Sequence, residues 1–575
     1  NKRQRAATRE RTMDVKKILS QHIEIDGVSG EEIYSLVTET ADSRLGDFSL
    51  PCFRFAKALK TSPVKIAEDL KEKFDGCEIV SEVRAVNGYL NFFVDNKVFS
   101  REVLAEAAAD GFGSSRVGNG KTICIDYSSI NIAKPFHIGH LGTTAIGGSL
   151  YKIFKKLGYN VVGINHLGDW GTQFGKLIVA YDLWGDREKI EKGGVEALQE
   201  IYVRFHREEE TRPELTEQAR HWFALIEQGD KRALELFHWF KDITLKEVDK
   251  IYKRLNVTFD SYNGESFYND KMQPVLDELE SKGLIQTSDG AKIVDLSAYD
   301  MPPCLLVKAD GATLYATRDL AAAFYRKKTY DFDKSLYVVA YQQNLHFRQL
   351  FKVLELMGCD WAKDCVHVAY GMVSLAEGAM STRKGNVVWL SKVLDKAVEK
   401  AMAIIDEKNP SLENKAEVAE KVGVGAVMFS ALQNARIKDI TFSLDKVLNF
   451  EGETCPYLQY TYARTGSVLS KAGNIVNARI MPDYSALDND ESKELVKLLN
   501  RYPSVIADAA DKYEPSVISK YLIDLAQAFN RFYIAHRILD EPTARQIARL
   551  TLTKCVNKTI KDGLALLGID VPEKM

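Results

Sequence analysis

The sequence predicts an α/β protein built on a doubly wound parallel sheet, with a small α/β domain before the sheet and an all-helical domain after it. Strand-like and helix-like segments alternate from residue 121 to about 390, which is the pattern of such a sheet. Four glycines within residues 111–120 indicate a linker before it. From residue 392 onward almost all signals are helical. We expect domains at residues 13–115, 116–391 and 392–575.

The composition is that of an ordinary globular protein. The chain has 575 residues, 45% hydrophobic and 27% charged, with a formal net charge of −3, so any RNA contact must come from local basic patches. The eight cysteines include no Cys-x-x-Cys pair, which argues against a disulfide framework or a four-cysteine zinc site and favours the cytoplasm. No run of about 18 apolar residues could span a membrane. Residues 1–12 are polar and basic, and we expect them to lie outside the fold as a leader or an added segment.

Residues 13 to about 110 read as a small α/β domain. Hydrophobic periodicity predicts helices and strands there, with the helices near 15–22, 64–74 and 97–109 and the strands near 79–86 and 89–94. The second strand alternates polar and aromatic residues. Spacing alone indicates only a strand with alternating faces, in which Tyr89 and Phe93 could lie in the core with Asn87 in a turn.

The central domain should contain parallel strands near 122–126, 160–165, 336–341 and 365–370. Between about 180 and 300 the pattern turns helical and highly charged, which we interpret as a helical insertion with a solvated face. In the last domain the best helix is expected at 517–536, where apolar and aromatic residues recur at steps of three and four. Such spacing is typical of the core of a helical bundle.

The stretch from Asp126 to His140 is the most informative part of the chain. It reads as the end of a buried strand, a polar turn and the start of a helix over 141–156 that stops before Gly158. The start of a helix presents backbone N–H groups and a positive dipole end, so it suits a phosphate. His137 and His140 would lie together at that end, and Gly139 between them leaves room for a flat base or a backbone. We therefore predict a nucleotide site with two imidazoles.

This stretch, Asn-Ile-Ala-Lys-Pro-Phe-His-Ile-Gly-His at 131–140, resembles the HIGH signature of class I aminoacyl-tRNA synthetases. With Gly-Asp-Trp-Gly-Thr-Gln-Phe-Gly at 168–175 downstream, it is similar to the arginyl-tRNA synthetase family. The resemblance implies a Rossmann-like, HIGH-type nucleotide-binding domain. It also implies that the chain activates L-arginine with ATP to arginyl-adenylate and transfers the arginine to its tRNA.

A second loop, Gly-Ala-Met-Ser-Thr-Arg-Lys-Gly-Asn at 378–386, could close on a triphosphate and neutralise the charge of the leaving pyrophosphate. It resembles the family's KMSKS loop, but Ala379 and Thr382 stand where that pattern has lysines. The resemblance implies that Lys134 substitutes for a missing lysine. Which of the basic residues contacts which phosphate stays open. The residues implied for ATP and catalysis are His137, His140, Gly139, Lys134, Met380, Ser381, Arg383 and Lys384.

A guanidinium substrate requires carboxylates, because its planar donors pair bidentately with them and its buried charge needs a partner. Asp126 closes the first strand of the central domain, and Asp319 lies at the start of a predicted helix. Matched to the arginyl pattern, Asp126, Tyr315 and Asp319 are implied to hold the guanidinium. The same matching places Asn131 and Gln343 on the α-amino and α-carboxylate groups.

Contacts with tRNA are less specific in the sequence. Lys554, Lys558 and Lys561 recur at helical spacing, although such a stripe is usually only a solvated face. The resemblance implies that the first domain binds the tRNA elbow and that the last binds the anticodon by stacking bases on aromatic side chains. The candidate contacts are Asn87, Tyr89, Asn91, Tyr460, Arg464, Lys554 and Lys558.

The expected partners are therefore the tRNA for arginine, L-arginine and ATP, with Mg²⁺ carried by the nucleotide, no zinc, no membrane and a monomeric chain. Two alternatives remain. The chain could be another HIGH-type nucleotidylyl transferase or a synthetase for a different amino acid, although two acidic candidates argue against a neutral substrate. It could also be a non-catalytic tRNA-binding paralogue, although both histidines and the loop are present.

Overall fold

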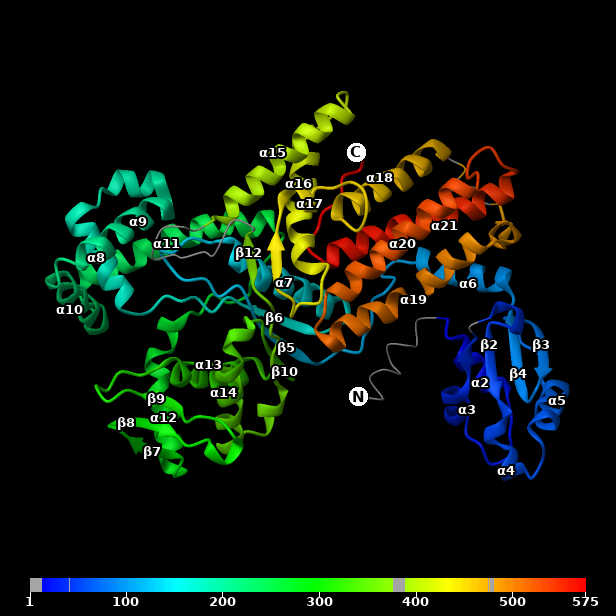
Figure 1. Cartoon of the computed structure of the whole chain (residues 1–575), viewed down its shortest axis with the longest axis horizontal. Coiled ribbons are helices and arrows are strands. Elements are labelled where there is room, and N and C mark those ends of the chain that lie inside the picture. The colour runs from blue at the N-terminus through cyan, green and yellow to red at the C-terminus, as the bar shows by residue number, and fades with distance from the viewer. Residues whose placement is uncertain (1–12, 41, 376–387, 474, 476–479) are drawn as a thin grey trace. The chain divides into compact units, whose positions relative to one another are not determined.

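The computed structural model describes residues 13–575 except 41, 376–387, 474 and 476–479 (Figure 1). Contacts within the chain divide it into two compact units. Unit 1 consists of the described residues within Asn1–Ser115, Thr461–Ala507 and Tyr521–Asp562. Unit 2 consists of those within Arg116–Tyr460, Asp508–Lys520 and Gly563–Met575. Nowhere in these described ranges is a helix long and apolar enough to cross a membrane.

Unit 1 begins with a four-stranded antiparallel sheet in the order β1-β2-β4-β3. Asn87 and Gly88 join β3 to β4, and both have positive φ (49° and 80°), as a tight hairpin turn requires. The predicted elements of this domain are confirmed to within a residue or two. The strands are Thr38–Glu39 (β1), Phe48–Pro51 (β2), Val80–Val86 (β3) and Tyr89–Val94 (β4), and the helices are Val15–His22 (α2), Gly30–Leu36 (α3), Ala56–Leu59 (α4), Pro63–Lys73 (α5) and Asn96–Ala108 (α6).

The helical domain forms as predicted. Tyr521, Phe529 and Phe532 are buried, which confirms the bundle core expected from their spacing, whereas Tyr533 of the same pattern is 40% exposed. In unit 1, Tyr502 stacks on Tyr521 with ring centroids 5.4 Å apart. The helices of the last part of the chain are Cys455–Ala472 (α18), Asp490–Lys512 (α19), Ser516–Ala535 (α20) and Thr543–Leu566 (α21).

Unit 2 contains the predicted parallel sheet, with strand order β11-β10-β5-β6. The chain passes from β5 to β6 on one side and later returns to β10 on the other, so the topological switch point lies between β5 and β10. Ligands of open α/β sheets bind at the carboxyl ends of the strands at this point. The strands are Thr122–Asp126 (β5), Asn160–Ile164 (β6), Lys334–Tyr337 (β10) and Cys365–His367 (β11).

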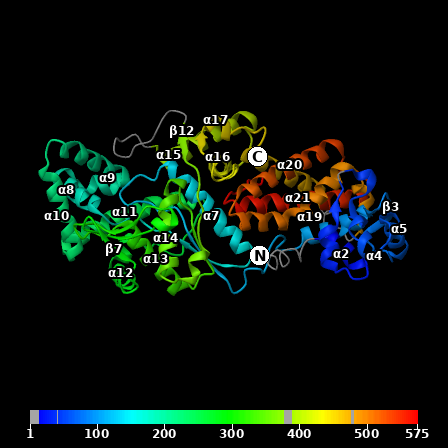
Figure 2. The same cartoon turned by 60° about the horizontal axis from the view of Figure 1, so that its bottom comes forward.

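Helices cover both faces of this sheet. On one face, Cys124 belongs to a buried cluster with residues of α12, α13 and α14. The neighbouring side chains of β5, Ile123 and Ile125, point to the opposite face and are buried there, where α7 packs on β5 and β6. The same elements can be followed from another side in Figure 2. Helix α7 begins and ends where the sequence predicts. The bounds are Leu141–Lys156 (α7), Met272–Ser281 (α12), Tyr315–Tyr330 (α13) and Asn344–Leu356 (α14).

The insertion into the sheet domain is only partly helical. Four helices come first, Thr172–Trp184 (α8), Arg187–Glu209 (α9), Glu214–Gln228 (α10) and Lys231–Arg254 (α11). A three-stranded antiparallel sheet follows, made of Ile285–Ser288 (β7), Ala291–Val294 (β8) and Cys304–Val307 (β9). The prediction of helices up to about residue 300 was therefore wrong for this stretch. Asp289-Gly290, both with positive φ, form the two-residue turn that brings β7 and β8 together.

The rest of unit 2, on either side of residues 376–387, is mostly helical. One short parallel pair of strands joins residues before and after that stretch. The elements are Val373–Leu375 (β12), Leu390–Lys408 (α15), Lys415–Leu432 (α16), Ile440–Phe442 (β13) and Leu444–Val447 (α17).

Candidate active site

The connection from β5 to α7 adopts an unusual backbone. Ser128, Ser129 and Ala133 have φ values of 71°, 45° and 57°, in the left-handed region that favours glycine. Hydrogen bonds from other elements hold this conformation: Thr143 Oγ1 accepts from Ser128 N (3.0 Å), and Thr244 Oγ1 accepts from Ala133 N (3.0 Å). The surrounding helices thus fix a strained turn at the carboxyl end of β5.

A network of buried hydroxyl groups supports the same turn. Ser128 Oγ lies 2.7 Å from Tyr252 OH and accepts from Thr144 Oγ1 (3.0 Å). Asn165, the residue after β6, donates to Tyr252 OH (2.9 Å). Because each member is buried and bonded, the network sets the position of the turn relative to α7 and α11.

The two histidines form one unit just before α7. Their ring centroids are 4.0 Å apart, and His140 also stacks on Phe136. His137 Nδ1 accepts a hydrogen bond from Gly139 N (3.0 Å), and His140 Nδ1 accepts one from His137 N (3.2 Å). The predicted pairing of the histidines is therefore observed. The backbone N–H groups of His137 and Gly139, however, are used by the imidazoles, so they are not left open for an anion.

This geometry determines which nitrogen of each ring can donate. Burial lowers the pKa of His137 to about 4 and that of His140 to about 3, so both rings are neutral near pH 7. In each ring Nδ1 already acts as an acceptor, and the single proton of a neutral imidazole must then be on Nε2. The pair thus offers two neutral Nε2–H donors at the start of α7.

Arg326 lies near both predicted arginine-binding carboxylates, because its charge acts on Asp319 and its Nη2 donates to Asp126. Asp319 pairs with His346 Nε2 (2.7 Å). Although burial opposes it, the hydrogen bond from His346 and the nearby cationic groups lower the pKa of Asp319 below its usual value. Asp126 is 7% exposed and accepts from Arg326 Nη2 (2.6 Å) at Oδ2 and from Ser129 Oγ (2.7 Å) at Oδ1. The sequence had suggested neither His346 nor Arg326.

The other predicted arginine ligands are open to solvent. Tyr315 is 68% exposed at the start of α13, one turn before Asp319. Gln343 and Asn131 are also exposed. Asn131 forms a bridge with Gly168, where a Cβ atom would come within 2.2 Å of Asn131 Oδ1. Only glycine at 168 therefore leaves space for the Asn131 side chain.

The structure adds one acidic residue that the sequence analysis did not find. Glu265 lies near Arg318, Asp319 and Lys134, and burial raises its pKa to about 7. A carboxyl group poised between its charged and neutral forms is common at functional sites. Residue 265 lies 50 or more residues from every predicted site residue in the sequence and belongs to no motif, so only the fold reveals it.

Asp169, in the second matched motif, has a structural role. It is fully buried and accepts from Lys241 Nζ (2.7 Å) and from Ser266 N and Oγ (both 2.8 Å). It thereby ties the loop after β6 to α11 and to the segment that carries Glu265. Lys134 is half-buried in the β5–α7 connection.

Part of the predicted ATP site cannot be placed. Met380, Ser381, Arg383 and Lys384 lie outside the described residues, and they remain predictions from the sequence. Among the described residues, no group of three or more His, Cys, Asp or Glu side chains could hold a metal ion.

The predicted RNA contacts of the first domain differ in exposure. Tyr89 is 43% exposed and meets the exposed ring of Phe53 edge-on, with centroids 5.2 Å apart, and Asn87 lies in the adjoining turn. Asn91 is only 4% exposed, and its Oδ1 accepts from Ser49 Oγ (2.6 Å). The Asn91 side chain is thus held inside the sheet, where it is not open to an RNA.

The candidates in the helical domain differ in the same way. Tyr460 and Lys554 are exposed. Arg464 donates to Asn530 Oδ1 (2.7 Å). Lys558 donates to the carbonyl oxygens of Ala108 and Ala109 at the end of α6. Lys558 therefore already has a role within unit 1.

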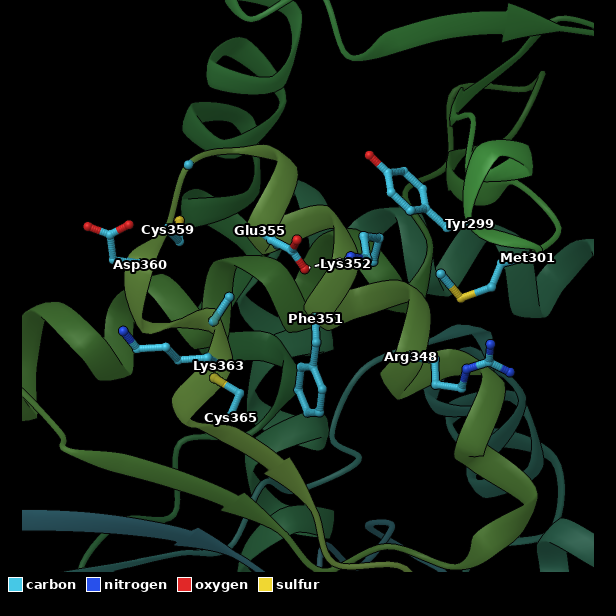
Figure 3. Close-up of a pocket in the computed structure, with 12 residues that line it drawn as sticks. Tyr299, Met301, Arg348, Phe351, Lys352, Glu355, Cys359, Asp360, Lys363 and Cys365 are labelled. Atoms are coloured by element: carbon cyan, nitrogen blue, oxygen red, sulfur yellow. Dashed lines mark hydrogen bonds and ion pairs between the residues drawn. The ribbon is translucent and has the colours of Figure 1, made fainter. Parts of the chain in front are cut away.

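A cavity of about 800 Å³ in unit 2 does not coincide with this site (Figure 3). It lies along the second half of α14, where Lys352 pairs with Glu355 at 2.6 Å and lies 4.6 Å from the centroid of the Tyr299 ring. None of the predicted site residues lines it.

Models of known protein families match most of the chain. A model described as "tRNA synthetases class I (R), catalytic domain" matches residues 102–444. The chain belongs to the arginyl-tRNA synthetase family. Two further models match the flanking parts: "Arginyl tRNA synthetase N terminal domain" at residues 13–94 and "DALR anticodon binding domain" at residues 458–575.

Individual relatives cover nearly the whole chain. Arginine–tRNA ligase of Alkaliphilus metalliredigens is 51% identical over 554 residues, which are 96% of this chain and 98% of that protein. That of Clostridium botulinum strain Alaska E43 is 51% identical over 566 residues, 98% of this chain and 99% of that protein. The solved structure of Thermus thermophilus arginyl-tRNA synthetase superposes with a TM-score of 0.78 at 27% identity, covering 94% of this chain and 96% of that one.

These matches confirm the predicted family, the class I fold and the activity of an arginine–tRNA ligase. The alternatives of a different synthetase and of a non-catalytic paralogue receive no support from relatives this similar and this complete.

Proposed function

We propose that the carboxyl ends of β5 and β10 bind arginine and ATP side by side, and that a carboxylate oxygen of arginine attacks the α-phosphorus there. Pyrophosphate leaves, and a terminal ribose hydroxyl of tRNA then attacks the arginyl carbonyl, releasing AMP. One observation carries this proposal: two neutral imidazoles, whose Nε2–H groups are fixed as donors, end the same connection that begins after Asp126 at the carboxyl end of β5. Such chemistry needs positioned donors more than a proton-transfer residue.

On the ATP side we assign hydrogen bonds from His137 and His140 to the phosphates, which strengthen as charge moves onto the leaving pyrophosphate. Gly139 between them allows close approach of the nucleotide. Lys134 adds a positive charge from the same connection. Met380, Ser381, Arg383 and Lys384 would complete the site from their loop.

On the arginine side we assign the guanidinium to Asp319 and Asp126, with the Tyr315 ring beside it. Asp319 supports this role because its lowered pKa keeps it charged at neutral pH. Asn131 and Gln343, both exposed, are assigned to the α-amino and α-carboxylate groups.

Glu265 belongs to the same pocket in this proposal. Its pKa of about 7 reflects burial, with Asp319 and Asp169 as neighbouring negative charges. A bound arginine would bring a positive charge beside it and lower that pKa, so Glu265 would release its proton when arginine binds. The pocket can thus adjust its charge to a cationic substrate.

For the tRNA, we propose contacts from Asn87 and Tyr89 to the elbow and from Tyr460, Arg464 and Lys554 to the anticodon stem and loop, with Lys558 in a supporting position. The aromatic pair Tyr89–Phe53 is suited to stack on an unpaired base. Consistent with the family, we propose domains at 13–115, 116–391 and 392–575, action as a monomer in the cytoplasm, Mg²⁺ bound only as part of the ATP substrate, and no zinc.

The decisive experiment is arginine-dependent exchange of labelled pyrophosphate into ATP, measured with and without tRNA. Exchange with arginine alone among the amino acids supports the assigned pocket. Exchange with another amino acid would leave the nucleotide site standing and discard the arginine assignment. The arm without tRNA reports whether the adenylate forms before tRNA binds.

A further inference from the structure

One of the carboxylates proposed to bind arginine belongs to a buried ion pair. Arg326 is 1% exposed, and its Nη2 donates to Asp126 Oδ2 at 2.6 Å. Arg326 lies on α13 seven residues after Asp319, two helical turns along the same face. The helix that presents one proposed substrate carboxylate therefore also carries the partner of the other.

The surroundings of Arg326 hold it in place. Its Nη2 also lies 3.4 Å from His166 Nδ1, and its guanidinium carbon lies 5.4 Å from the centroid of the Tyr337 ring. A guanidinium can only donate, so His166 must accept through Nδ1 in its neutral form. In the described part of the chain, Nε of Arg326 has no hydrogen-bond partner.

Stability alone does not account for this arrangement. Replacing a buried ion pair by apolar side chains of similar size is often neutral or stabilising, whereas removing one partner is costly. Here, in addition, both carboxylate oxygens of Asp126 are held by hydrogen bonds: Arg326 holds Oδ2, and Ser129 holds Oδ1. The plane of the Asp126 carboxylate is thus set at both oxygens, and each oxygen keeps a lone pair that can face the substrate.

We propose that Arg326 is a positioning residue for arginine selection, which acts through Asp126. It holds the Asp126 carboxylate in the orientation that accepts the substrate guanidinium and balances its charge when the pocket is empty. This inference rests on the proposed arginine pocket. It predicts that Arg326 affects the binding of arginine but not that of ATP, because its contacts are with Asp126, His166 and Tyr337 and not with residues assigned to ATP.

The test is a double-mutant cycle in the full chain, with R326M, D126N and D126N/R326M compared by pyrophosphate exchange in the presence of tRNA. R326M should raise the KM for arginine by about 30-fold or more, with little change in the KM for ATP. R326K, which keeps the charge, should recover part of the loss. R220M, which removes an exposed arginine of α10, is the matched control.

The sharpest prediction is the direction in which R326M changes the KM for arginine when D126N is already present. D126N leaves Arg326 as an uncompensated buried cation beside the substrate guanidinium, so it should raise the KM for arginine strongly. Adding R326M to D126N removes that cation and should lower the KM again. The same Arg326 substitution thus raises the KM in one background and lowers it in the other. This comparison remains informative if R326M alone fails to fold, since the double variant removes both charges.

Two results would overturn the inference. The first is independence, in which the effects of R326M and D126N on arginine KM multiply. The second is an equal rise of the KM values for arginine and ATP, which would indicate a general structural role. Failure of the proposed function itself looks different: the unmodified chain would then show no exchange, or exchange with an amino acid other than arginine.

Discussion

The tautomer of the histidine pair leads to a specific prediction for H140Q and H140A. A glutamine side chain can place an N–H donor near the position of Nε2, but it cannot carry the charge of an imidazolium. If the neutral donor is what matters, H140Q should keep much of the rate of pyrophosphate exchange. H140A should lose about 100-fold to 1,000-fold in kcat, the usual effect of deleting one donor that stabilises a transition state.

The magnitude follows from the structure. His140 Nδ1 is already used by His137 N at 3.2 Å, so only the Nε2–H remains for a phosphate oxygen. Its lowered pKa, about 3, excludes a role for the imidazolium at neutral pH. The rate of exchange should therefore not depend on His140 ionisation across the neutral pH range. H140A should leave the KM for arginine nearly unchanged, since arginine is assigned to other residues.

Two outcomes would refute this reasoning. One is a rate that falls as the pH rises through the ordinary histidine pKa, because it would mean that the imidazolium is the active form. The other is an H140Q variant as slow as H140A. The same pKa shifts also predict stability: because both histidines bind protons less readily when folded, the free energy of unfolding should decrease as the pH falls from about 6.5 toward 4.

Three further predictions concern other parts of the chain. D319N should lower kcat/KM for arginine by about 30-fold or more in the exchange assay, with the KM for ATP as the internal control. Y502F removes the buried donor to Asp562 (2.5 Å) and should lower the free energy of unfolding by about 1–3 kcal/mol in thermal or denaturant unfolding, without changing the exchange rate. K554M should weaken tRNA binding and reduce its salt dependence, whereas K558M should mainly lower stability, because Lys558 holds the end of α6. Equal effects of the two lysine variants on tRNA affinity would contradict this distinction.

The sequence predicted local features of the site well because they depend on neighbouring residues. The strand that ends at Asp126 and the helix at 141–156 follow from hydrophobic pattern and turn chemistry. The partner of Asp126 could not be found in this way, because Arg326 is 200 residues away and meets it only through the crossover of the sheet. The same applies to Glu265, which the segment after α11 brings beside α13.

Two errors have a clear physical origin. The helical, highly charged pattern seen at 204–210 and 241–253 was extended up to about residue 300, although Asp289-Gly290 carried the signal for a two-residue hairpin turn. At Asn91, alternation predicted a polar face, but β4 lies between β2 and β3, and most of its side chains on both faces are covered. In the first case the helical pattern of the preceding residues outweighed a local turn signal. In the second case the central position of β4 in its sheet determined that the Asn91 side chain is buried.

The strained turn at Ser128, Ser129 and Ala133 has a consequence for protein engineering. Each non-glycine residue in the left-handed region costs about 1 kcal/mol or more, so S129G and A133G would relax the backbone and favour the folded state. A screen that selects only for heat resistance would therefore collect glycines in this turn. Ser129 also holds the Asp126 carboxylate, so S129G would loosen a residue proposed to bind arginine. The most heat-resistant variants from such a screen should therefore be among the least selective for arginine.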